Sequence, residues 1–411
     1  MTTQDPFVIV GGGLAGAKAA ETLRTEGFDG PVVLVAGEDE VPYERPPLSK
    51  GLLLGSAERD SVFVHEADWY AKNDVDLRTG ARAEAIDKDA HEVVLAGGER
   101  VGYSRLLLAT GARPRRLPVP GADLDGVHYL RTLADSDRLG ETLTDGTRLV
   151  IVGAGWIGLE IAAAARTRGA AVTVVEMAHL PLQRVLGDTI AEVFAGLHRE
   201  HGVTFHFDAG VAELRGSGRV EEVVLADGTV LPADAVLVAV GAQPNTELAE
   251  AAGLPVDNGV LVGASLASGE PDIFAAGDVA NAEHPLLHTR VRVEHWANAL
   301  NMGPVAAKAM MGQDAAYDLL PYFYTDQYDL GMEYSGFVPD PNVDVVVRGD
   351  LAAREFIAFW VDEGRVLAGM NVNVWDVTDD IQALVRAGWG GRAVDARKLA
   401  DPTVPMGDLL A

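Results

Sequence analysis

An apolar run followed by an alanine-rich helical pattern occurs twice along the chain. Residues 8–27 read VIVGGGLAGAKAAETLRTEG and residues 150–169 read VIVGAGWIGLEIAAAARTRG, at a constant offset of 150 − 8 = 142. Each apolar run is typical of a buried strand, and the spacing that follows is typical of a helix. A glycine in a suitable place to end each helix follows, Gly27 or Gly169. The pattern predicts two copies of a strand–turn–helix unit.

Both copies join strand and helix through the sequence G-x-G-x-x-G. Its glycines are Gly11, Gly13 and Gly16 in the first copy and Gly153, Gly155 and Gly158 in the second. The first glycine permits a tight turn, the second lets backbone N–H groups approach a pyrophosphate, and the third lets helix and strand pack closely. The helix N-terminus then faces the anion. We therefore predict two dinucleotide sites, which also include Leu14, Ala15 and Ile157.

An acid follows the second strand of each unit. Glu38 lies 38 − 16 = 22 residues after the last glycine of its motif, and Glu176 lies 176 − 158 = 18 residues after its own. This spacing is near the ~20 residues typical of a carboxylate that binds ribose hydroxyls. Because an acid repels a 2′-phosphate, and no arginine follows Glu176 before Arg184, the second site favours NADH over NADPH. The alternative is an exposed acid at a strand end.

A later strand with a glycine turn completes each copy. Residues 106–114 read LLLATGARP and residues 235–244 read AVLVAVGAQP, and their glycines Gly111 and Gly241 are 130 residues apart. These turns can approach the same nucleotides as the glycine motifs, and Thr110 lies in the first of them. The second dinucleotide-binding unit therefore interrupts the first.

Alternating apolar and polar residues lie between these strands in both copies. The stretches HEVVLAGGERV (91–101) and VEEVVLADGTVL (220–231) contain glycine turns and predict antiparallel hairpins. Together with the strand–turn–helix units they indicate an α/β fold with two Rossmann-like domains.

Composition excludes several classes of function. The net charge of −28 disfavours nucleic acid or an anionic membrane as the main partner. The absence of cysteine removes disulfide, thiolate-metal and bound iron–sulfur chemistry. The longest apolar run, 149–165, is interrupted by glycines and an acid, so we expect no membrane span. With no secretory signal pattern, we expect a cytoplasmic protein.

Several motifs together resemble one group of flavoproteins, the ferredoxin, putidaredoxin and rubredoxin reductases. The motifs are GGGLAG, YERPPLSKG, LLLATGARP, YLRTL, GAGWIGLE, AAGDVA, VEHWANA and FYTDQYDLG. The resemblance implies a glutathione-reductase-like architecture with a small α+β C-terminal domain. It also implies these boundaries: an FAD domain at 1–114 and 243–319, an NADH domain at 115–242 and a C-terminal reductase domain at 320–411.

The resemblance implies further contacts to FAD. The segment PDIFAAGDVA (271–280) is similar to the second FAD fingerprint of these flavoproteins, in which the aspartate binds the ribityl chain. Asp278, after Gly277, takes that position, and a helix N-cap is the alternative role. The other implied contacts are Arg45, Lys50, Ala83, Arg131 and Trp296.

Lys50 and Glu160 are the residues that the resemblance implies for hydride transfer. It implies an ion pair beside flavin N5, in which Lys50 supports the negative charge of the reduced flavin. Without the resemblance, Lys50 would be a solvated lysine after a Pro-Pro turn. Glu160 would be an acid suited to the helix dipole.

Histidine is the remaining candidate for metal binding. His198 and His201 are three residues apart on a helix that we expect to be exposed, and His206 enters a strand. Because neither thiolates nor an acid triad accompany them, we predict no metal site.

The electron acceptor that the resemblance implies is a small [2Fe-2S] ferredoxin that serves a monooxygenase or dioxygenase. Ferredoxins are commonly acidic, so an acidic reductase needs a local basic patch. Arg290 and Arg292 are the candidates for this patch, and ordinary strand-face arginines are the alternative. Tyr322 and Tyr324 replace tryptophans common in the group, and Tyr324 keeps an aromatic wall at the expected docking region.

Two alternatives to a ferredoxin reductase stay open at this point. One is a cysteine-independent NADH oxidase or quinone reductase. The other is a redox-responsive interaction protein similar to apoptosis-inducing factor, in which NADH binding changes assembly.

Overall fold

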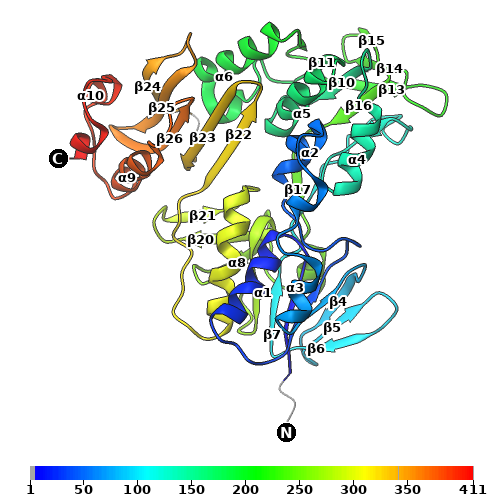
Figure 1. Ribbon diagram of the computed structural model, residues 1–411. Coiled ribbons are helices and arrows are strands. Elements are labelled where there is room, and N and C mark those ends of the chain that lie inside the picture. The colour runs from blue at the N-terminus through cyan, green and yellow to red at the C-terminus, as the bar shows by residue number, and fades with distance from the viewer. Residues whose placement is uncertain (1–4, 341, 411) are drawn as a thin grey trace. The chain divides into compact units, whose positions relative to one another are not determined.

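The computed structural model describes residues 5–340 and 342–410, and the chain forms two compact units (Figure 1). The first unit contains the described residues of Met1–Glu44, Asp60–Arg113 and Ala242–Tyr322. The second contains those of Arg45–Arg59, Pro114–Gly241 and Phe323–Ala411. The RPPLSK turn therefore belongs to the second unit, although the flanking chain belongs to the first. The boundary between the expected NADH and C-terminal domains stays a prediction.

A five-stranded parallel sheet forms the centre of the first unit. Its strands lie in the order β19 (Ile273–Ala275), β7 (Arg105–Leu108), β1 (Phe7–Val10), β2 (Val32–Val35) and β3 (Val75–Arg78). β1 is fully buried and reads FVIV, as expected for a parallel strand that is covered on both faces. The first strand–turn–helix unit is therefore a Rossmann-type core.

The second unit repeats this arrangement around a second parallel sheet. Its strands lie in the order β12 (Thr204–His206), β11 (Ala171–Val175), β10 (Arg148–Val152), β16 (Ala235–Val238) and β9 (Val127–His128). β10 pairs with β11 on one side and β16 on the other, just as β1 pairs with β2 and β7. This equivalence confirms the predicted duplication.

The duplication extends to the ends of the helices after the glycine turns. α1 (Leu14–Thr25) and α5 (Trp156–Thr167) are followed by Gly27 at φ 84° and Gly169 at φ 88°, the left-handed backbone that a helix-ending glycine adopts. Arg24 donates to the carbonyl oxygen of Phe28 at 2.7 Å. Arg166, its counterpart, binds the carbonyl oxygen four residues further on in the same way.

Two antiparallel three-stranded sheets confirm the predicted hairpins. They are β4 (Ala83–Asp87), β5 (Glu92–Leu95) and β6 (Arg100–Gly102) in the first unit, and β13 (Val211–Arg215), β14 (Glu222–Leu225) and β15 (Val230–Pro232) in the second. Both have a glycine at positive φ in the second turn, Gly98 or Gly228.

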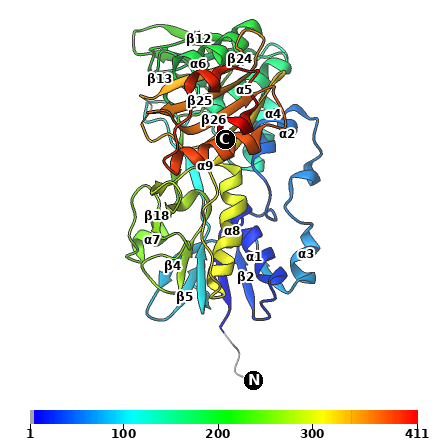
Figure 2. The same cartoon turned by 90° about the vertical axis from the view of Figure 1, so that its left-hand side faces the viewer.

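α1 and α8 (Trp296–Met310) lie side by side in the first unit (Figures 1 and 2). A Cβ at Gly303 would lie 2.4 Å from the backbone oxygen of Ala15, so only glycine permits this close approach. The remaining elements of this unit are α3 (Ala67–Lys72), β8 (Ala112–Pro114), β17 (Ala242–Pro244), α7 (Glu247–Ala251), β18 (Val260–Val262), η3 (Gly277–Val279), β20 (Ala280–His284) and β21 (Thr289–Val291).

The C-terminal part of the chain folds as a five-stranded antiparallel sheet within the second unit. Its strands lie in the order β22 (Tyr322–Gln327), β23 (Leu330–Gly336), β26 (Arg365–Val372), β25 (Glu355–Asp362) and β24 (Asp344–Asp350). Helix α9 (Thr378–Trp389) lies against β26 (Figures 1 and 2). A Cβ at Gly388 would lie 2.1 Å from the backbone oxygen of Val366, which explains a glycine in this helix.

The other elements of the second unit surround its two sheets. They are η1 (Pro46–Ser49), α2 (Gly51–Leu54), α4 (Leu133–Thr142), α6 (Gln183–Glu200), α10 (Ala396–Ala400) and η4 (Met406–Leu410). Among the described residues, no helix combines the length and apolar character needed to cross a membrane.

Candidate functional site

The glycine turn of the first unit is shaped by close backbone contacts. Gly11 has φ 131°, and a Cβ there would lie 2.0 Å from the backbone oxygen of Ala109 on the neighbouring segment. A Cβ at Gly16 would lie 2.0 Å from the backbone oxygen of Gly11. Gly13, the N-cap of α1, differs, because a Cβ there would meet no described heavy atom within 4 Å. Open space at a helix N-terminus fits a phosphate group.

The glycine turn of the second unit has the same three environments. A Cβ at Gly153 would lie 2.4 Å from the oxygen of Ala239, and one at Gly158 would lie 2.2 Å from the oxygen of Gly153. A Cβ at Gly155, the N-cap of α5, would meet no described heavy atom within 4 Å. Ile157, on the first turn of α5, is 47% exposed beside this open space. Both turns therefore fit a dinucleotide pyrophosphate.

The two predicted ribose-binding acids lie just beyond their strands. Glu176 accepts hydrogen bonds from the backbone N–H of Ala154, in the glycine turn, at 2.7 Å and of Ala178 at 2.8 Å. Glu38 accepts a hydrogen bond from the hydroxyl group of Tyr43. The Glu176 carboxylate thus lies at the edge of its glycine turn, as a ribose-binding acid requires.

Other predicted FAD residues lie around the glycine turn of the first unit. The Thr110 hydroxyl donates to the backbone oxygen of Asn245 at 2.8 Å, and Gly111 has φ 66°. A Cβ at Gly277 would lie 3.1 Å from the Cβ of Ala15, so η3 approaches α1 closely. Asp278 follows as the second residue of η3 and is buried. Ala276 occupies the N-cap position, so the alternative role of Asp278 as an N-cap is wrong.

Two more of these residues lie elsewhere in the first unit. Trp296 begins α8, and its indole N–H donates to Glu44 at 3.2 Å. Ala83 begins β4 and is buried at the edge of the small antiparallel sheet.

The remaining predicted FAD contacts belong to the second unit. Arg45 precedes η1 and donates to the backbone oxygen of Arg131, so the structure brings these two predicted residues together. The backbone N–H of Arg131 donates to the carboxylate of Asp135 at 3.1 Å, and this carboxylate also accepts from the backbone N–H of Thr132, the N-cap of α4. Gly241, the second late glycine, has φ 97° and accepts from the backbone N–H of Arg115 at 2.9 Å.

Lys50 and Glu160 form a nearly buried ion pair within the second unit. Lys50 Nζ lies 2.7 Å from Glu160 Oε1, and the side chains are 17% and 7% exposed. Glu160 is the fifth residue of α5, and Lys50 lies between η1 and α2. The resemblance alone implied this pairing, and the structure confirms the ion pair itself.

Two hydroxyl groups that the sequence did not single out complete the environment of Glu160. Ser49 Oγ donates to Oε2 at 2.5 Å, and Thr325 Oγ1 donates to Oε1 at 2.6 Å. Both residues lie within quoted motifs, YERPPLSKG and FYTDQYDLG, and proximity to Lys50 was the signal for Ser49. Thr325 comes from β22, so the C-terminal sheet contributes directly to the Lys50–Glu160 pair.

Tyr324 and Asp326 flank this cluster. Lys50 Nζ lies 5.6 Å from the centre of the Tyr324 ring, a cation–π distance. Burial raises the pKa of Asp326 above its usual value, Lys50 opposes this shift, and Glu160 adds to it. The ammonium group of Lys50 therefore lies among an aromatic face and two acids.

The prediction that His198 lies on an exposed helix surface is wrong. Its side chain is fully buried between α6 and the C-terminal sheet, where Nε2 lies 2.8 Å from Gln327 Oε1. His201 stacks on Tyr328 at 3.6 Å between ring centres, and His206 ends β12. Over residues 5–340 and 342–410, no group of three histidine or acidic side chains is arranged to hold a metal ion.

The two predicted docking arginines are engaged within the first unit. Arg290 binds Glu283 at 3.0 Å and the backbone oxygens of Val262 and Asn281. Arg292 is only 11% exposed and binds Glu294 at 2.6 Å. These contacts agree with the alternative of strand-face arginines and do not favour a basic docking patch.

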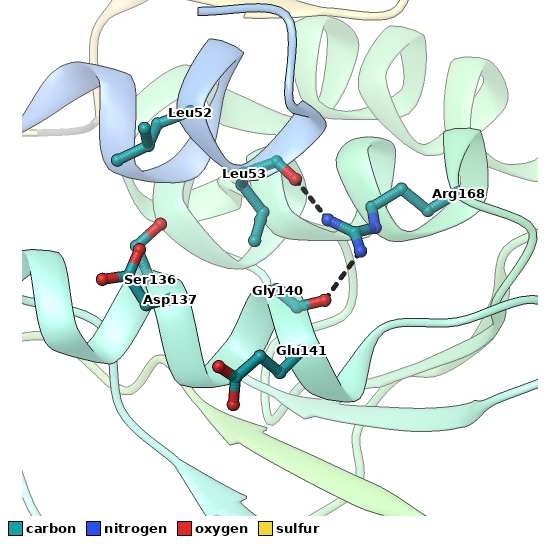
Figure 3. A pocket seen from close by; sticks show the side chains of 7 residues that line it. All are labelled: Leu52, Leu53, Ser136, Asp137, Gly140, Glu141 and Arg168. Atoms are coloured by element: carbon teal, nitrogen blue, oxygen red, sulfur yellow. Dashed lines mark hydrogen bonds between the residues drawn. The ribbon is translucent and has the colours of Figure 1, made fainter. Parts of the chain in front are cut away.

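A shallow pocket in the second unit lies where α2 meets α4 (Figure 3). The guanidinium group of Arg168 donates to the backbone oxygens of Leu53 at 2.6 Å, Gly140 at 2.7 Å and Leu143 at 3.0 Å. Because these carbonyl groups occupy its donors, Arg168 ties α2 to α4 instead of binding an anion. The pocket does not include the Lys50–Glu160 pair or the glycine turns.

Comparison with known proteins places this geometry in a family. Residues 5–303 match the pyridine nucleotide-disulphide oxidoreductase family, and residues 322–410 match the reductase C-terminal family. The chain is 41% identical to the anthranilate 1,2-dioxygenase system ferredoxin–NAD(+) reductase component of Burkholderia cepacia, over 98% of both chains. It is 36% identical to putidaredoxin reductase of Pseudomonas putida, over all of this chain and 98% of that protein.

A solved structure has the same fold. The covalent putidaredoxin reductase–putidaredoxin complex matches with a TM-score of 0.94 and 36% identity, over 100% of this chain and 99% of the other. The two Rossmann-type sheets and the C-terminal antiparallel sheet agree with that likeness. The chain therefore belongs to the pyridine nucleotide-disulphide oxidoreductase family, within its ferredoxin and putidaredoxin reductase group.

Proposed function

We propose that this protein is an FAD-dependent reductase that oxidises NADH and passes single electrons to a small [2Fe-2S] ferredoxin of an oxygenase system. The nearly buried Lys50–Glu160 pair, in a chain with two dinucleotide-binding turns, is the observation that carries the proposal. Similarity to ferredoxin–NAD(+) reductase components over almost the entire chain supports it.

The residues present fit the two cofactors. The open space at Gly13 and Gly155 suits a pyrophosphate on each helix N-terminus, and Glu38 and Glu176 would bind ribose hydroxyls. When bound, FAD supplies a group that takes two electrons as hydride and releases them singly. Because the chain has no cysteine, it cannot pass these electrons through a thiol pair, as disulfide reductases of this family do.

The Lys50–Glu160 pair would act through its charge. Lys50 carries a fixed positive charge on a side chain that Glu160 holds in one place. A preorganised cation lowers the free energy of a transition state in which negative charge develops, because it needs no reorganisation. We therefore propose that Lys50 stabilises the reduced cofactor and that Glu160 positions Lys50.

Steady-state kinetics with and without ferredoxin test the function. Purified protein loaded with FAD should reduce a cytochrome with NADH, and added [2Fe-2S] ferredoxin should raise the rate strongly. NADH oxidation that ferredoxin does not accelerate would instead support an oxidase or a quinone reductase. A long-lived reduced protein that dimerises with NADH would support a redox-responsive interaction protein.

We also propose a cytoplasmic location, where NADH and a ferredoxin partner would both be available. Fractionation of the source cells should recover the protein with the cytoplasmic fraction.

A further inference from the structure

Glu160 is held by more donors than an ion pair requires. Its Oε1 atom accepts from Lys50 and Thr325, and its Oε2 atom accepts from Ser49. Only 7% of Glu160 is exposed, and a buried carboxylate is stable only when its oxygen atoms find such partners. The two hydroxyl groups therefore fix the orientation of the carboxylate, in addition to the charge of Lys50.

The hydrogen bond from Thr325 continues into a longer chain. Gln327 Nε2 donates to Thr325 Oγ1 at 3.3 Å, so the Gln327 oxygen faces the other way, toward His198 Nε2 at 2.8 Å. An oxygen there requires a hydrogen on Nε2 of His198, because an amide oxygen only accepts. The other ring nitrogen, Nδ1, then accepts from the hydroxyl group of Tyr328 at 3.5 Å. Every donor in this series of hydrogen bonds points toward Glu160.

Burial makes this direction hard to reverse. The side chains of Thr325, Gln327 and His198 are 1%, 0% and 0% exposed, so water does not compete for their hydrogen bonds. Burial also keeps His198 neutral, because it lowers the pKa of the imidazole to about 4. A neutral His198 has one donor and one acceptor, so it can donate to Gln327 and accept from Tyr328.

We propose that Thr325 is a positioning residue for the reductase reaction, with Gln327 and His198 fixing the direction of its hydroxyl group. Thr325 holds Oε1 of Glu160 toward the ammonium group of Lys50, so that the cation stays where the reaction requires it. This inference rests on the proposed function. It assigns β22 of the C-terminal sheet a role in flavin reduction, in addition to any role in binding the acceptor.

Thr325→Val tests the proposal, because valine keeps the shape of threonine and removes the donor. In the FAD-loaded protein without ferredoxin, the limiting rate of flavin reduction by NADH should fall roughly tenfold, the effect of losing a hydrogen bond to a charged group. The midpoint potential of the bound flavin should become more negative, because the less ordered cation stabilises the reduced form less. Thr325→Ser, which keeps the hydroxyl group, should restore both values.

Thr378→Val provides a matched control in the same part of the chain. Its hydroxyl group donates to Glu333 at 2.8 Å, so it removes the same kind of hydrogen bond away from Lys50. In this variant the limiting rate of flavin reduction should stay within twofold of wild type, and the midpoint potential of the flavin should not change. Thr325→Val should lower the melting temperature, because it leaves Glu160 and Gln327 each without one buried hydrogen-bond partner. NAD⁺ affinity should stay near wild type, because a general loss of structure would weaken nucleotide binding.

Two results would overturn the inference. One is a Thr325→Val protein whose flavin is reduced as fast as in wild type and at the same potential. The other is a Thr325→Ser protein as impaired as Thr325→Val. Failure of the proposed function would look different, because wild-type flavin would then be reduced by NADH without passing electrons to ferredoxin.

Discussion

The two Rossmann-type units differ most at the residue two positions after the last glycine of the motif. In the first unit this residue is Lys18, which is 24% exposed and pairs with Glu21 on the same helix. In the second it is Glu160, which is 7% exposed and accepts from three residues of two other segments. The backbone position is the same, and the chemistry of the side chain depends on what packs against it.

The surroundings of the two helices explain this difference. α1 is approached closely by α8, where Gly303 leaves space for the backbone of Ala15. α5 is instead approached by the Ser49–Lys50 turn and by β22, which bring hydroxyl and ammonium groups. The two glycine turns are alike, and the contacts around them make α1 a packing surface for α8 and place the Glu160 carboxylate of α5 beside Lys50.

We expect the largest effects from valine substitutions at the third glycine of each motif, and we expect the two variants to lose different cofactors. A valine at Gly16 or Gly158 would place Cβ about 2 Å from a backbone oxygen, which should cost about 3 kcal/mol or more of local stability. We expect Gly16→Val protein to lose FAD, measured by flavin absorbance after purification. Gly158→Val protein should keep FAD and lose reduction by NADH.

Gly13→Ala and Gly155→Ala are the matched controls for these variants. A Cβ at either position meets no described heavy atom within 4 Å, so both proteins should fold normally by circular dichroism. Each should bind its own nucleotide less tightly, because the Cβ occupies space meant for a phosphate. If Gly158→Val also loses FAD, the damage extends from α5 to the predicted FAD contacts of the second unit, Arg45 and Arg131.

The next effect compares Glu160 with Lys18. Glu160→Gln removes the charge that pairs with Lys50, and we expect flavin reduction to slow roughly a hundredfold, as for loss of a preorganised electrostatic contact. Lys18→Gln removes a partly exposed ion pair within α1 and should change this rate less than twofold. Stopped-flow reduction by NADH measures both, and equal effects would show that the shared backbone position is what matters.

Much of the fold could be predicted from the sequence, because local patterns determine it. The two parallel sheets, the helix-ending glycines and the hairpins follow from runs of apolar residues and from turn residues. The Lys50–Glu160 pair came only from a resemblance, since 110 residues separate the partners. Thr325 was missed, because the partner of a hydroxyl group depends on tertiary packing. His198 was wrongly expected to be exposed, because the sequence does not show which element covers a helix.

His198 predicts a smaller effect, on stability at acid pH. Burial lowers its pKa from 6.5 to about 4, so between these values the unfolded chain binds a proton there and the folded chain does not. Stability from this group is therefore complete above the unfolded pKa and is lost as the pH falls toward 4. We expect a loss of about 2 kcal/mol between pH 8 and pH 5 in urea unfolding.

His198→Gln isolates this contribution. The glutamine amide can donate to Gln327 but does not titrate, so the variant should lose less stability than wild type over the same pH range. Burial also lowers the pKa of His65, His128 and His295, so some acid sensitivity should remain. An unchanged pH dependence in His198→Gln protein would contradict the assignment.

The smallest effect compares the two acids that follow the second strands. Glu176 binds backbone N–H groups at its glycine turn, while Glu38 binds the hydroxyl group of Tyr43. Glu176→Gln should weaken NADH binding about tenfold, as expected for the loss of one charged hydrogen bond to a ribose. It should also reduce the preference for NADH over NADPH, measured as the ratio of their kcat/KM values. Glu38→Gln should weaken FAD retention and leave the NADH-to-NADPH ratio of kcat/KM unchanged. If Glu38→Gln changes that ratio as much as Glu176→Gln does, the assignment of one nucleotide to each unit is wrong, because only the NADH-binding unit should sense a 2′-phosphate.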